Sequence, residues 1–232
     1  MKLNLKTTIA IVVIAIFFGC EIPYRDDARL LIKGQVLDEN SEPISGANVA
    51  VYAREGVSFF TGTLTTLLNE TETLADGSFS TIMLLALDEN FVIEVSVDNN
   101  YSRYQYRTDT VAFVPEDFLI DLGTVPVERL ASLNYNITQE NASSLDFEYT
   151  FSYVTTQCTE VYSEGVLNTE ASSCYETTTR SSALTADNPN DTGSFSTLLG
   201  AEVLFTYRIN DQPELTETLV IDQTDYEFNF AY

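Results

Sequence analysis

The stretch IKGQVLDENSEPISGANVAVYA, from Ile32 to Ala53, decides how the chain begins to fold. Gly34 lies inside an apolar strand, where a glycine permits a bulge or the close approach of another segment. The polar residues between Asp38 and Pro43 are typical of a turn, and Gly46 gives the backbone the freedom to re-enter a sheet. The stretch therefore predicts a strand, a tight loop and a second strand.

The rest of the chain has the same β character. The segment FVIEVSVD, residues 91–98, alternates apolar and polar side chains with a period of two, which is typical of a half-buried strand. Asp76-Gly77 precedes another apolar run and is a strong turn signal. No segment after Cys20 combines a long 3.6-residue period with helix-capping residues. These patterns predict an all-β fold of two tandem β-sandwich domains.

The boundary between the two sandwiches is expected near residue 127. Pro126 lies at the end of one apolar strand, and a new alternating run opens at Leu130. We expect one sandwich over residues 30–127 and a second, of unknown type, over residues 128–232, where about seven short strands are separated by turns.

The first twenty residues have the pattern of a secretory leader. Lys2 and Lys6 give a positive start, an apolar run extends from Ile9 to Phe18, and the small residue Gly19 precedes Cys20. A membrane-spanning helix needs about 20 apolar residues, so this run is too short to be a membrane span. The pattern predicts a signal peptide over residues 1–19. In an ordinary signal peptide the cysteine that follows would be incidental.

The residues FFGC at positions 17–20 resemble the lipobox of bacterial lipoproteins. In that family the cysteine is lipidated and becomes the mature N-terminus. The resemblance implies that Cys20 is acylated, that residues 20–29 form a tether, and that the protein is an outer-membrane lipoprotein of the cell envelope, on the periplasmic or the surface face. Acyl chains contribute about 0.8 kcal/mol per buried methylene, so several chains hold a protein on a bilayer without a helix.

A second resemblance concerns the first sandwich. Its residues are a G-x-V strand, an acidic turn, a proline and a G-A-x-V strand, followed later by an Asp-Gly-x-Phe turn: Gly34, Val36, Asp38, Pro43, Gly46, Ala47, Val49, Asp76, Gly77 and Phe79. Together they resemble the carboxypeptidase regulatory-like domain, a transthyretin-like β-sandwich. The resemblance covers residues 30–127 and implies a structural scaffold that brings no catalytic group. The glycine that this family has in the first turn is replaced here by Ser41-Glu42.

The composition excludes several functions. Removal of the leader takes two of the eleven Lys and Arg residues, which leaves nine basic against 35 acidic residues and a net charge of −26. Such a chain repels phosphate backbones, so we expect no nucleic-acid partner. The sequence contains no histidine, which removes the usual zinc sites and the Ser-His-Asp triad. We therefore expect no enzyme activity. A carboxylate pair, as in a glycosidase, is the chemistry that stays open.

Cys158 and Cys174 are the only cysteines besides Cys20. An exported chain meets an oxidising compartment, where an even pair usually forms a disulfide. The turn candidate SEG at residues 163–165 lies close to midway between the two cysteines, which suits cross-strand neighbours.

Two further candidate sites concern ligands. Tyr101, Tyr104 and Tyr106 lie in the segment NNYSRYQYR, where Tyr104 and Tyr106 would share one face of a strand and could stack on a sugar. The alternative is that these tyrosines pack across neighbouring strands.

The segment TADNPNDTG, residues 185–193, places Asp187, Asn190 and Asp191 close together. Their oxygens suit calcium, although the spacing does not fit an EF-hand. The alternative is a polar turn. We expect no other cofactor.

Together these features predict a cell-envelope lipoprotein with a non-catalytic binding or assembly role at the outer membrane. Its partners would be the membrane, through the lipid anchor, and envelope proteins or polysaccharide. The alternatives are a polysaccharide-binding accessory of an outer-membrane uptake system and a carboxylate-based glycosidase. We expect the specific contacts on loops of the second sandwich, near Asp187 to Gly193, because loops on a rigid scaffold usually carry binding.

Overall fold

The fold is all-β, as predicted. The computed structural model describes residues 24–58, 62–140 and 146–232, and within these ranges it contains strands and no helix. Two separate hydrophobic cores divide the strands into two tandem β-sandwiches.

The first sandwich contains a three-stranded sheet in the order β4-β1-β7 and a larger sheet in the order β11-β10-β6-β5-β2-β3, with β12 also paired to β10. Strand β1 runs antiparallel to β4 and parallel to β7. The strands of this sandwich are β1 (Tyr24–Leu37), β2 (Asn48–Ser58), β3 (Gly62–Glu72), β4 (Ser78–Ala86), β5 (Phe91–Ser96), β6 (Arg103–Thr108), β7 (Leu119–Pro126), β10 (Gln157–Ser163), β11 (Val166–Leu167) and β12 (Ser173–Cys174).

The second sandwich contains a four-stranded sheet in the order β13-β9-β15-β16 and a three-stranded sheet in the order β14-β8-β17. Strand β17 runs parallel to β8, and the other pairs are antiparallel. The strands are β8 (Leu130–Thr138), β9 (Phe147–Val154), β13 (Thr177–Leu184), β14 (Asp191–Leu198), β15 (Glu202–Ile209), β16 (Leu215–Val220) and β17 (Asp225–Ala231).

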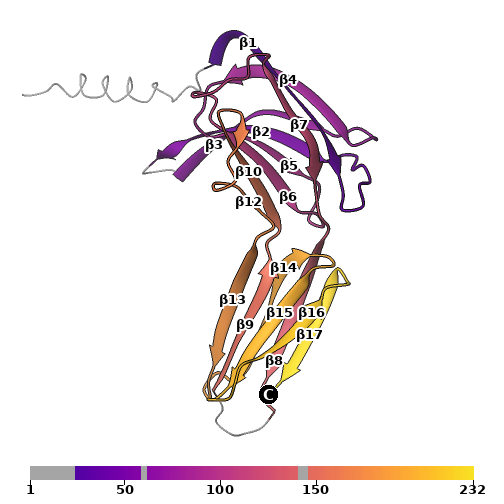
Figure 1. The fold of residues 1–232 in the computed structure, drawn as a ribbon, viewed down its shortest axis with the longest axis vertical. Helices are drawn as coiled ribbons and strands as arrows, with labels where there is room; N and C mark the ends of the chain where they lie inside the picture. The colour runs from indigo at the N-terminus through magenta and orange to yellow at the C-terminus, as the bar shows by residue number, and fades with distance from the viewer. Residues whose placement is uncertain (1–23, 59–61, 141–145) are drawn as a thin grey trace, which may run out of the picture.

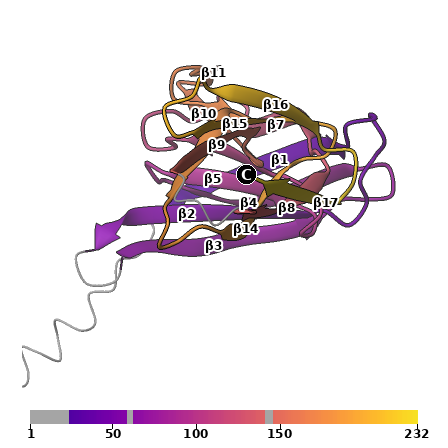
Figure 2. The ribbon, with the colours of Figure 1, turned by 90° about the horizontal axis from the view of Figure 1, so that it is seen from below.

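The two sandwiches are stacked end to end. Figure 1 shows β1 at the upper end of the molecule and the C-terminus at the lower end. Seen along the long axis, the second sandwich lies in front of the first (Figure 2). The molecule is therefore elongated, and the start of β1 and the distal loops of the second sandwich lie far apart.

Residues 155–176 do not belong to the sandwich in which the sequence places them. The sequence predicts that the whole of 128–232 forms the second sandwich, but β10 pairs in parallel with β6 of the first, from Gln157 beside Arg103 to Tyr162 beside Thr108. Strand β9 lies in the second sandwich and leads into β10 after two residues, and the chain returns through β12 to β13. The second sandwich is therefore interrupted by an excursion, residues 155–176, that completes a sheet of the first.

The first stretch folds as its residues predict. A Cβ at Gly34 would lie 2.8 Å from the ring of Phe79, so this position in β1 requires the close approach that only glycine permits. Asp38 accepts backbone hydrogen bonds from Asn40 and Glu42 at 2.9 and 2.8 Å, which forms the polar turn. Ser41 adopts the left-handed conformation in this turn, with φ of 64°.

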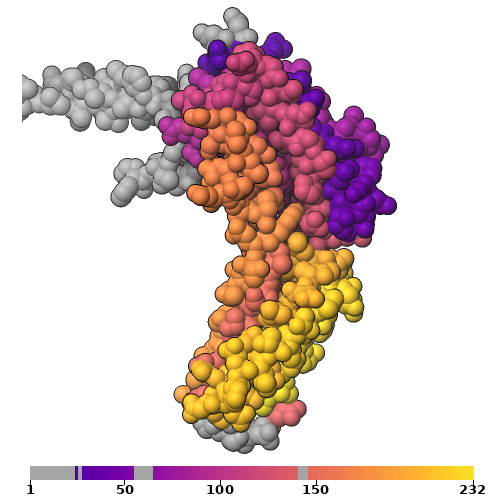
Figure 3. Space-filling view, viewed as in Figure 1, coloured from indigo at the N-terminus to yellow at the C-terminus, as the bar shows by residue number. Residues whose placement is uncertain are grey.

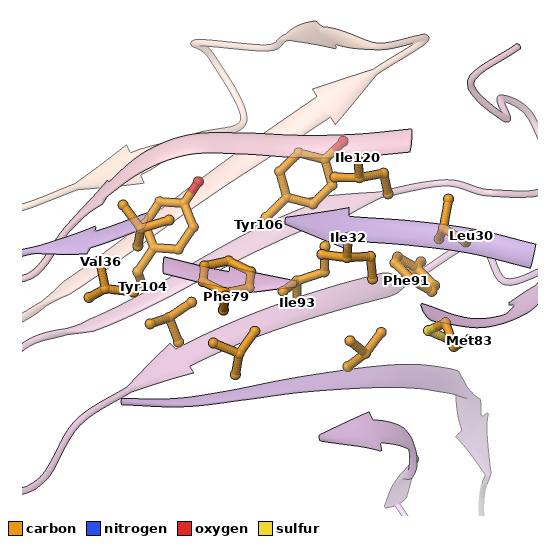
Figure 4. Close-up of a cluster of buried hydrophobic side chains, with 14 of the residues drawn as sticks. Leu30, Ile32, Val36, Phe79, Met83, Phe91, Ile93, Tyr104, Tyr106 and Ile120 are labelled. Carbon is orange, nitrogen blue, oxygen red and sulfur yellow. The ribbon is translucent and has the colours of Figure 1, made fainter. Parts of the chain in front are cut away.

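The core of the first sandwich takes one face of each strand. In β5, Phe91, Ile93 and Val95 are fully buried, as the period-two alternation predicts. Figure 4 shows that Phe91 and Ile93 lie in one layer with Ile32, Phe79 and other apolar side chains from the opposite sheet. Burial of an aliphatic or aromatic side chain contributes about 1.5–3 kcal/mol, so this layer is the main stabilising element of the sandwich.

The core of the second sandwich is aromatic. Phe147, Tyr149 and Phe151 alternate along β9 with outward-facing polar residues, and all three are buried. The ring of Phe151 lies 4.9 Å from that of Phe205 on β15, and the ring of Phe147 lies 4.1 Å from that of Tyr232. Each aromatic pair adds about 0.5–1.5 kcal/mol beyond the area it buries.

Candidate functional site

Two of the three tyrosines proposed as a sugar-binding face are in the core. Tyr104 and Tyr106 are 3% and 8% exposed, and Figure 4 shows both rings in the layer of Phe79 and Ile93. The ring of Tyr106 stacks on Tyr162 of the excursion at 4.5 Å. The alternative of cross-strand packing therefore describes them, because β10 pairs with β6 and places Tyr162 beside Tyr106, while apolar side chains of the opposite sheet cover the same face. Tyr101 is the one member of the set that stays partly exposed.

The hydroxyl of Tyr104 has a polar partner from the excursion. It donates a hydrogen bond to Glu160 at 2.7 Å, and the hydroxyl of Tyr162 donates to the same carboxylate oxygen at 3.1 Å. Burial, and then the hydrogen bond to the Glu160 carboxylate, raise the pKa of Tyr104 far above its ordinary value. Burial raises the pKa of Tyr106 to about 12. Both phenols are therefore neutral hydrogen-bonding groups of a folded core.

The proposed calcium loop is tied to its own sandwich by hydrogen bonds. The side-chain oxygen of Asn190 accepts the backbone N–H of Gln139 at 3.0 Å, and an Asp191 carboxylate oxygen accepts the hydroxyl of Tyr149. Asp187 is exposed. In the part of the chain that the structure describes, no three or more His, Cys, Asp and Glu side chains are grouped to hold a metal ion. These contacts favour the polar turn, and calcium binding stays a prediction.

Cys158 and Cys174 form a disulfide. They are directly opposite each other on the antiparallel strands β10 and β12. The predicted turn at residues 163–165 is also present, because Glu164 and Gly165 both have positive φ and connect β10 to β11. The disulfide joins the outgoing and the returning chain at the point where the excursion enters the first sandwich.

Cys20, the predicted lipidation residue, lies outside the described residues. The first described residue is Tyr24, so the predicted leader and tether stay predictions from the sequence. Among the described residues, no helix is long and apolar enough to cross a membrane.

The chain crosses between the sandwiches three times, and each crossing is hydrogen-bonded. At the first crossing, the N–H of Ser102 donates a hydrogen bond to the carbonyl of Glu128, and the N–H of Glu128 donates one to the hydroxyl of Ser102, both at 2.8 Å. Arg129 then pairs with Asp38 at 3.7 Å and with Glu39 at 3.2 Å. These contacts fix β8 against the first turn of the other sandwich.

The other two crossings run side by side. The N–H of Thr155 bonds to the carbonyl of Glu176 at 2.8 Å, and the N–H of Tyr175 bonds to the carbonyl of Gln157 at 3.1 Å. The hydroxyl of Tyr175 lies 2.9 Å from that of Ser102, which links these crossings to the first one. Three bonded crossings restrict bending between the sandwiches.

A groove of about 410 Å³ lies beside these crossings, at the waist of the molecule that Figure 3 shows in orange. Two stacked rings, Tyr153 of β9 and Phe195 of β14, line one part of it, with their centroids 4.1 Å apart. The other lining side chains carry neutral hydroxyl or amide groups: Thr155, Thr156, Gln157, Thr159, Ser173, Thr178 and Ser196.

A second hollow of about 210 Å³ adjoins the first and shares Thr156 and Gln157 with it. It is lined by charged and polar residues of the β5–β6 region, among them Asp98, Tyr101 and Arg103. Pockets of drug-sized ligands occupy about 300–1,000 Å³ and often lie between domains, so the two hollows together have the size of a binding site.

Sequence reasoning missed this groove, because its residues come from β9, the excursion, β13 and β14. The run TTQCT at 155–159 was the available signal: it is uncharged in a strongly acidic chain. Of the predicted site residues, Tyr101 lines the smaller hollow, none lines the larger groove, and the loop at 185–193 lies elsewhere.

No protein-family model matches this sequence, and no curated protein matches it. Solved structures with weak similarity include the Bacillus anthracis TIE protein, at 10% identity and a TM-score of 0.30 over 88% of this chain and 34% of that one. A shaft pilin, SpaA, from Lactobacillus rhamnosus GG has 10% identity and a TM-score of 0.31, over 88% of this chain and 98% of that one. A 3-chlorocatechol 1,2-dioxygenase from Rhodococcus opacus has 13% identity and a TM-score of 0.27, over 46% of this chain and 62% of that one. The chain thus spans about a third of the first of these structures, and likeness at this level identifies no function.

Proposed function

We propose that this protein is a cell-envelope lipoprotein, anchored through Cys20 at the outer membrane, with a non-catalytic binding or assembly role. The observation that carries the proposal is the elongated body with three bonded crossings. The described chain begins at Tyr24, only four residues after Cys20, and the loops of the second sandwich lie at the opposite end (Figure 1). An anchor at Cys20 would hold the upper end at the membrane and present the waist and the distal loops to partners.

The groove supports a non-catalytic role. Glycoside hydrolysis uses two carboxyl groups, about 5–9.5 Å apart, on either side of the scissile bond. The two hollows are lined by a single carboxylate, Asp98, in the smaller one. The chain also has no histidine to serve as a general base.

In this proposal the first sandwich is the scaffold, in line with its resemblance to carboxypeptidase regulatory-like domains. Its recognisable residues serve the backbone, since Gly34 admits the ring of Phe79 and Gly77 adopts φ of 74° in the turn before β4. A Cβ at Gly77 would lie 2.5 Å from the carbonyl oxygen of Val36. These are requirements of folding and bring no reactive group.

The anchor is tested in the native envelope. Cells that express the full chain are labelled with an alkyne fatty acid, and membrane fractions are compared for the wild type, for Cys20→Ser and for Thr8→Ser as a leader control. We expect label and membrane association in the wild type and the control, and an unlabelled precursor in Cys20→Ser. Acylation and normal cleavage of Cys20→Ser would show that the anchor is wrongly assigned.

The second candidate function is a polysaccharide-binding accessory of an uptake system. The buried tyrosines Tyr104 and Tyr106 no longer support it, but the neutral groove at the waist does. Incubation of the purified protein with neutral polysaccharides should release no reducing ends. Release that depends on Asp98 would instead favour the glycosidase.

A further inference from the structure

We infer that the groove at the waist is a binding site for a neutral polysaccharide, lodged against Tyr153, Gln157 and their hydroxyl-bearing neighbours. This inference rests on the proposed non-catalytic binding role and assigns a ligand class to it. The residues proposed here to contact the sugar differ from Tyr104 and Tyr106 of β6, which are buried in the core.

The first reason is the absence of charge in the larger hollow. The chain has 35 acidic residues, yet none of the nine residues that line this hollow is charged. A phosphate or carboxylate ligand would find no cation there, and an organic cation or a metal ion would find no carboxylate. A lipid tail would leave the hydroxyl and amide groups of the lining without hydrogen bonds. The chemistry that suits the lining is uncharged and rich in hydroxyl groups.

The second reason is that the polar groups are free to bind. Within the part of the chain that the structure describes, the side chains of Thr156, Gln157, Thr159 and Ser173 make no hydrogen bond to protein, in contrast to the nearby hydroxyls of Ser172 and Thr197, which bond to backbone carbonyls. Threonine, serine and glutamine offer both donors and acceptors, as the hydroxyl groups of a sugar require.

The third reason is the combination of rings with these groups. Tyr153 and Phe195 are each partly buried, so the pair presents apolar surface at the edge of a polar lining. A sugar ring has apolar C–H faces and polar edges, and an aromatic surface beside fixed hydrogen-bonding groups matches both.

The shape favours a chain of sugars over a single one. The larger and the smaller hollow share the lining residues Thr156 and Gln157, so the two hollows lie side by side. A linear ligand could therefore pass from the rings of the second sandwich to Tyr101 and Asn99 of the first. The disulfide lies next to the lining, since Gln157 and Thr159 flank Cys158 and Ser173 precedes Cys174, so it holds these walls in place.

The test uses the full exported chain, purified in detergent. Native gels are cast with neutral polysaccharides, namely a β-glucan, an α-glucan, a mannan and a galactan, and with alginate as a charged counterpart. Dissociation constants for the polysaccharide that retards the protein are then measured by calorimetry with its oligosaccharides. The variants are Tyr153→Ala and Gln157→Ala, with Gln212→Ala, an exposed glutamine in the distal β15–β16 turn, as matched control.

We expect at least one neutral polysaccharide to retard the wild type and alginate not to do so. Loss of one side-chain hydrogen-bonding group should weaken binding about tenfold for Gln157→Ala, with a greater loss for Tyr153→Ala and no change for Gln212→Ala. If Tyr153→Ala does not fold, Gln157→Ala decides, because its side chain is exposed and its loss leaves the core intact.

The inference is overturned if no neutral polysaccharide of the panel retards the protein, if alginate alone does, or if Gln157→Ala binds as the wild type does. Acyl labelling distinguishes failure of this inference from failure of the proposed anchor. If Cys20 is labelled but no polysaccharide retards the protein, the groove is wrongly assigned and the lipoprotein proposal is unaffected. If a neutral polysaccharide retards the protein but Cys20 is not labelled, the anchor is wrongly assigned and the groove is unaffected.

Discussion

Removal of the disulfide should loosen the excursion more than the rest of the molecule. The perturbation is the double variant Cys158→Ala/Cys174→Ala, compared with the oxidised wild type. The two residues are 16 apart in sequence, and a cross-link that closes a loop of this length stabilises the native state by about 3 kcal/mol in the chain-entropy model. For a chain of this size, 1 kcal/mol shifts the melting temperature by about 2–4 °C, so a loss of about 6–12 °C is expected.

The loss should be concentrated in residues 155–176. Strands β11 and β12 are exposed and have two residues each, so the cross-link adds to only a few hydrogen bonds that hold this part to β10, among them those of Asn168 and Ser172 with Val161. Strand β10 keeps its parallel pairing with β6 and the contacts of Tyr162 with Tyr106. The double variant should therefore retain its fold while the returning part of the excursion opens.

Calorimetry and hydrogen exchange check this expectation. Amides of residues 166–176 should exchange faster in the double variant, while those of β2 and β5 in the first core and of β15 in the second remain protected. Treatment of the wild type with a reductant should reproduce the change. A variant that melts within 1 °C of the wild type, or faster exchange spread evenly over both sandwiches, would refute the reasoning.

Three further predictions concern single residues. Tyr104→Phe should lower the free energy of unfolding by about 1–2 kcal/mol, because Glu160 loses a charge-assisted hydrogen bond. The control Tyr24→Phe, on the surface, should change this free energy little. Urea unfolding measures both variants, and equal stabilities of Tyr104→Phe and the wild type would contradict the prediction. Ser41→Gly should raise the free energy by up to about 1 kcal/mol, since Ser41 is in the left-handed conformation and glycine adopts it without strain, and a lower stability would contradict it. Burial and two neighbouring carboxylates raise the pKa of Glu128, so its ionisation in the folded state costs stability as the pH rises through that pKa; Glu128→Gln should therefore raise the melting temperature at pH 7 more than at pH 4, and the opposite order would contradict the sign.

The sequence predicts the local structure of the first sandwich well, because local rules govern it. The period-two pattern of residues 91–98 places Phe91 and Ile93 in the core, and Gly34 and Asp76-Gly77 mark a close approach and a turn. The disulfide could also be predicted, since Cys158 and Cys174 are the only cysteines after the predicted lipidation residue and have one pairing. In each case the deciding feature lies within a few residues or in a unique pair.

The excursion could not be predicted in this way. Alternation along residues 157–163 shows that the segment is a strand, but the same pattern fits an edge of either sandwich. Its pairing with β6 depends on Tyr106 and Tyr104 finding Tyr162 and Glu160, contacts between residues more than 50 apart in sequence. The pairing also places Tyr162 beside Tyr106, so the tyrosine face of β6 packs in a core that includes a strand from the second half of the sequence.

The same arrangement changes how function has to be assigned to a part of the chain. A cut near residue 127 appears natural from sequence, yet it would separate β6 from β10 and remove Cys158, Tyr162 and Tyr175 from the core to which they belong. If residues before such a cut lost binding, the result would show only that their sheet was incomplete.

The groove also depends on both parts of the chain. Its walls come from the excursion and from the second sandwich, and the neighbouring smaller hollow is lined mainly by the first. A binding site built from both bodies is pre-organised only while the crossings hold, and pre-organisation is what lets a shallow polar groove bind a flexible ligand. Binding and the integrity of the excursion should therefore be lost together, and point variants in the intact chain, such as Gln157→Ala, are the way to separate the two.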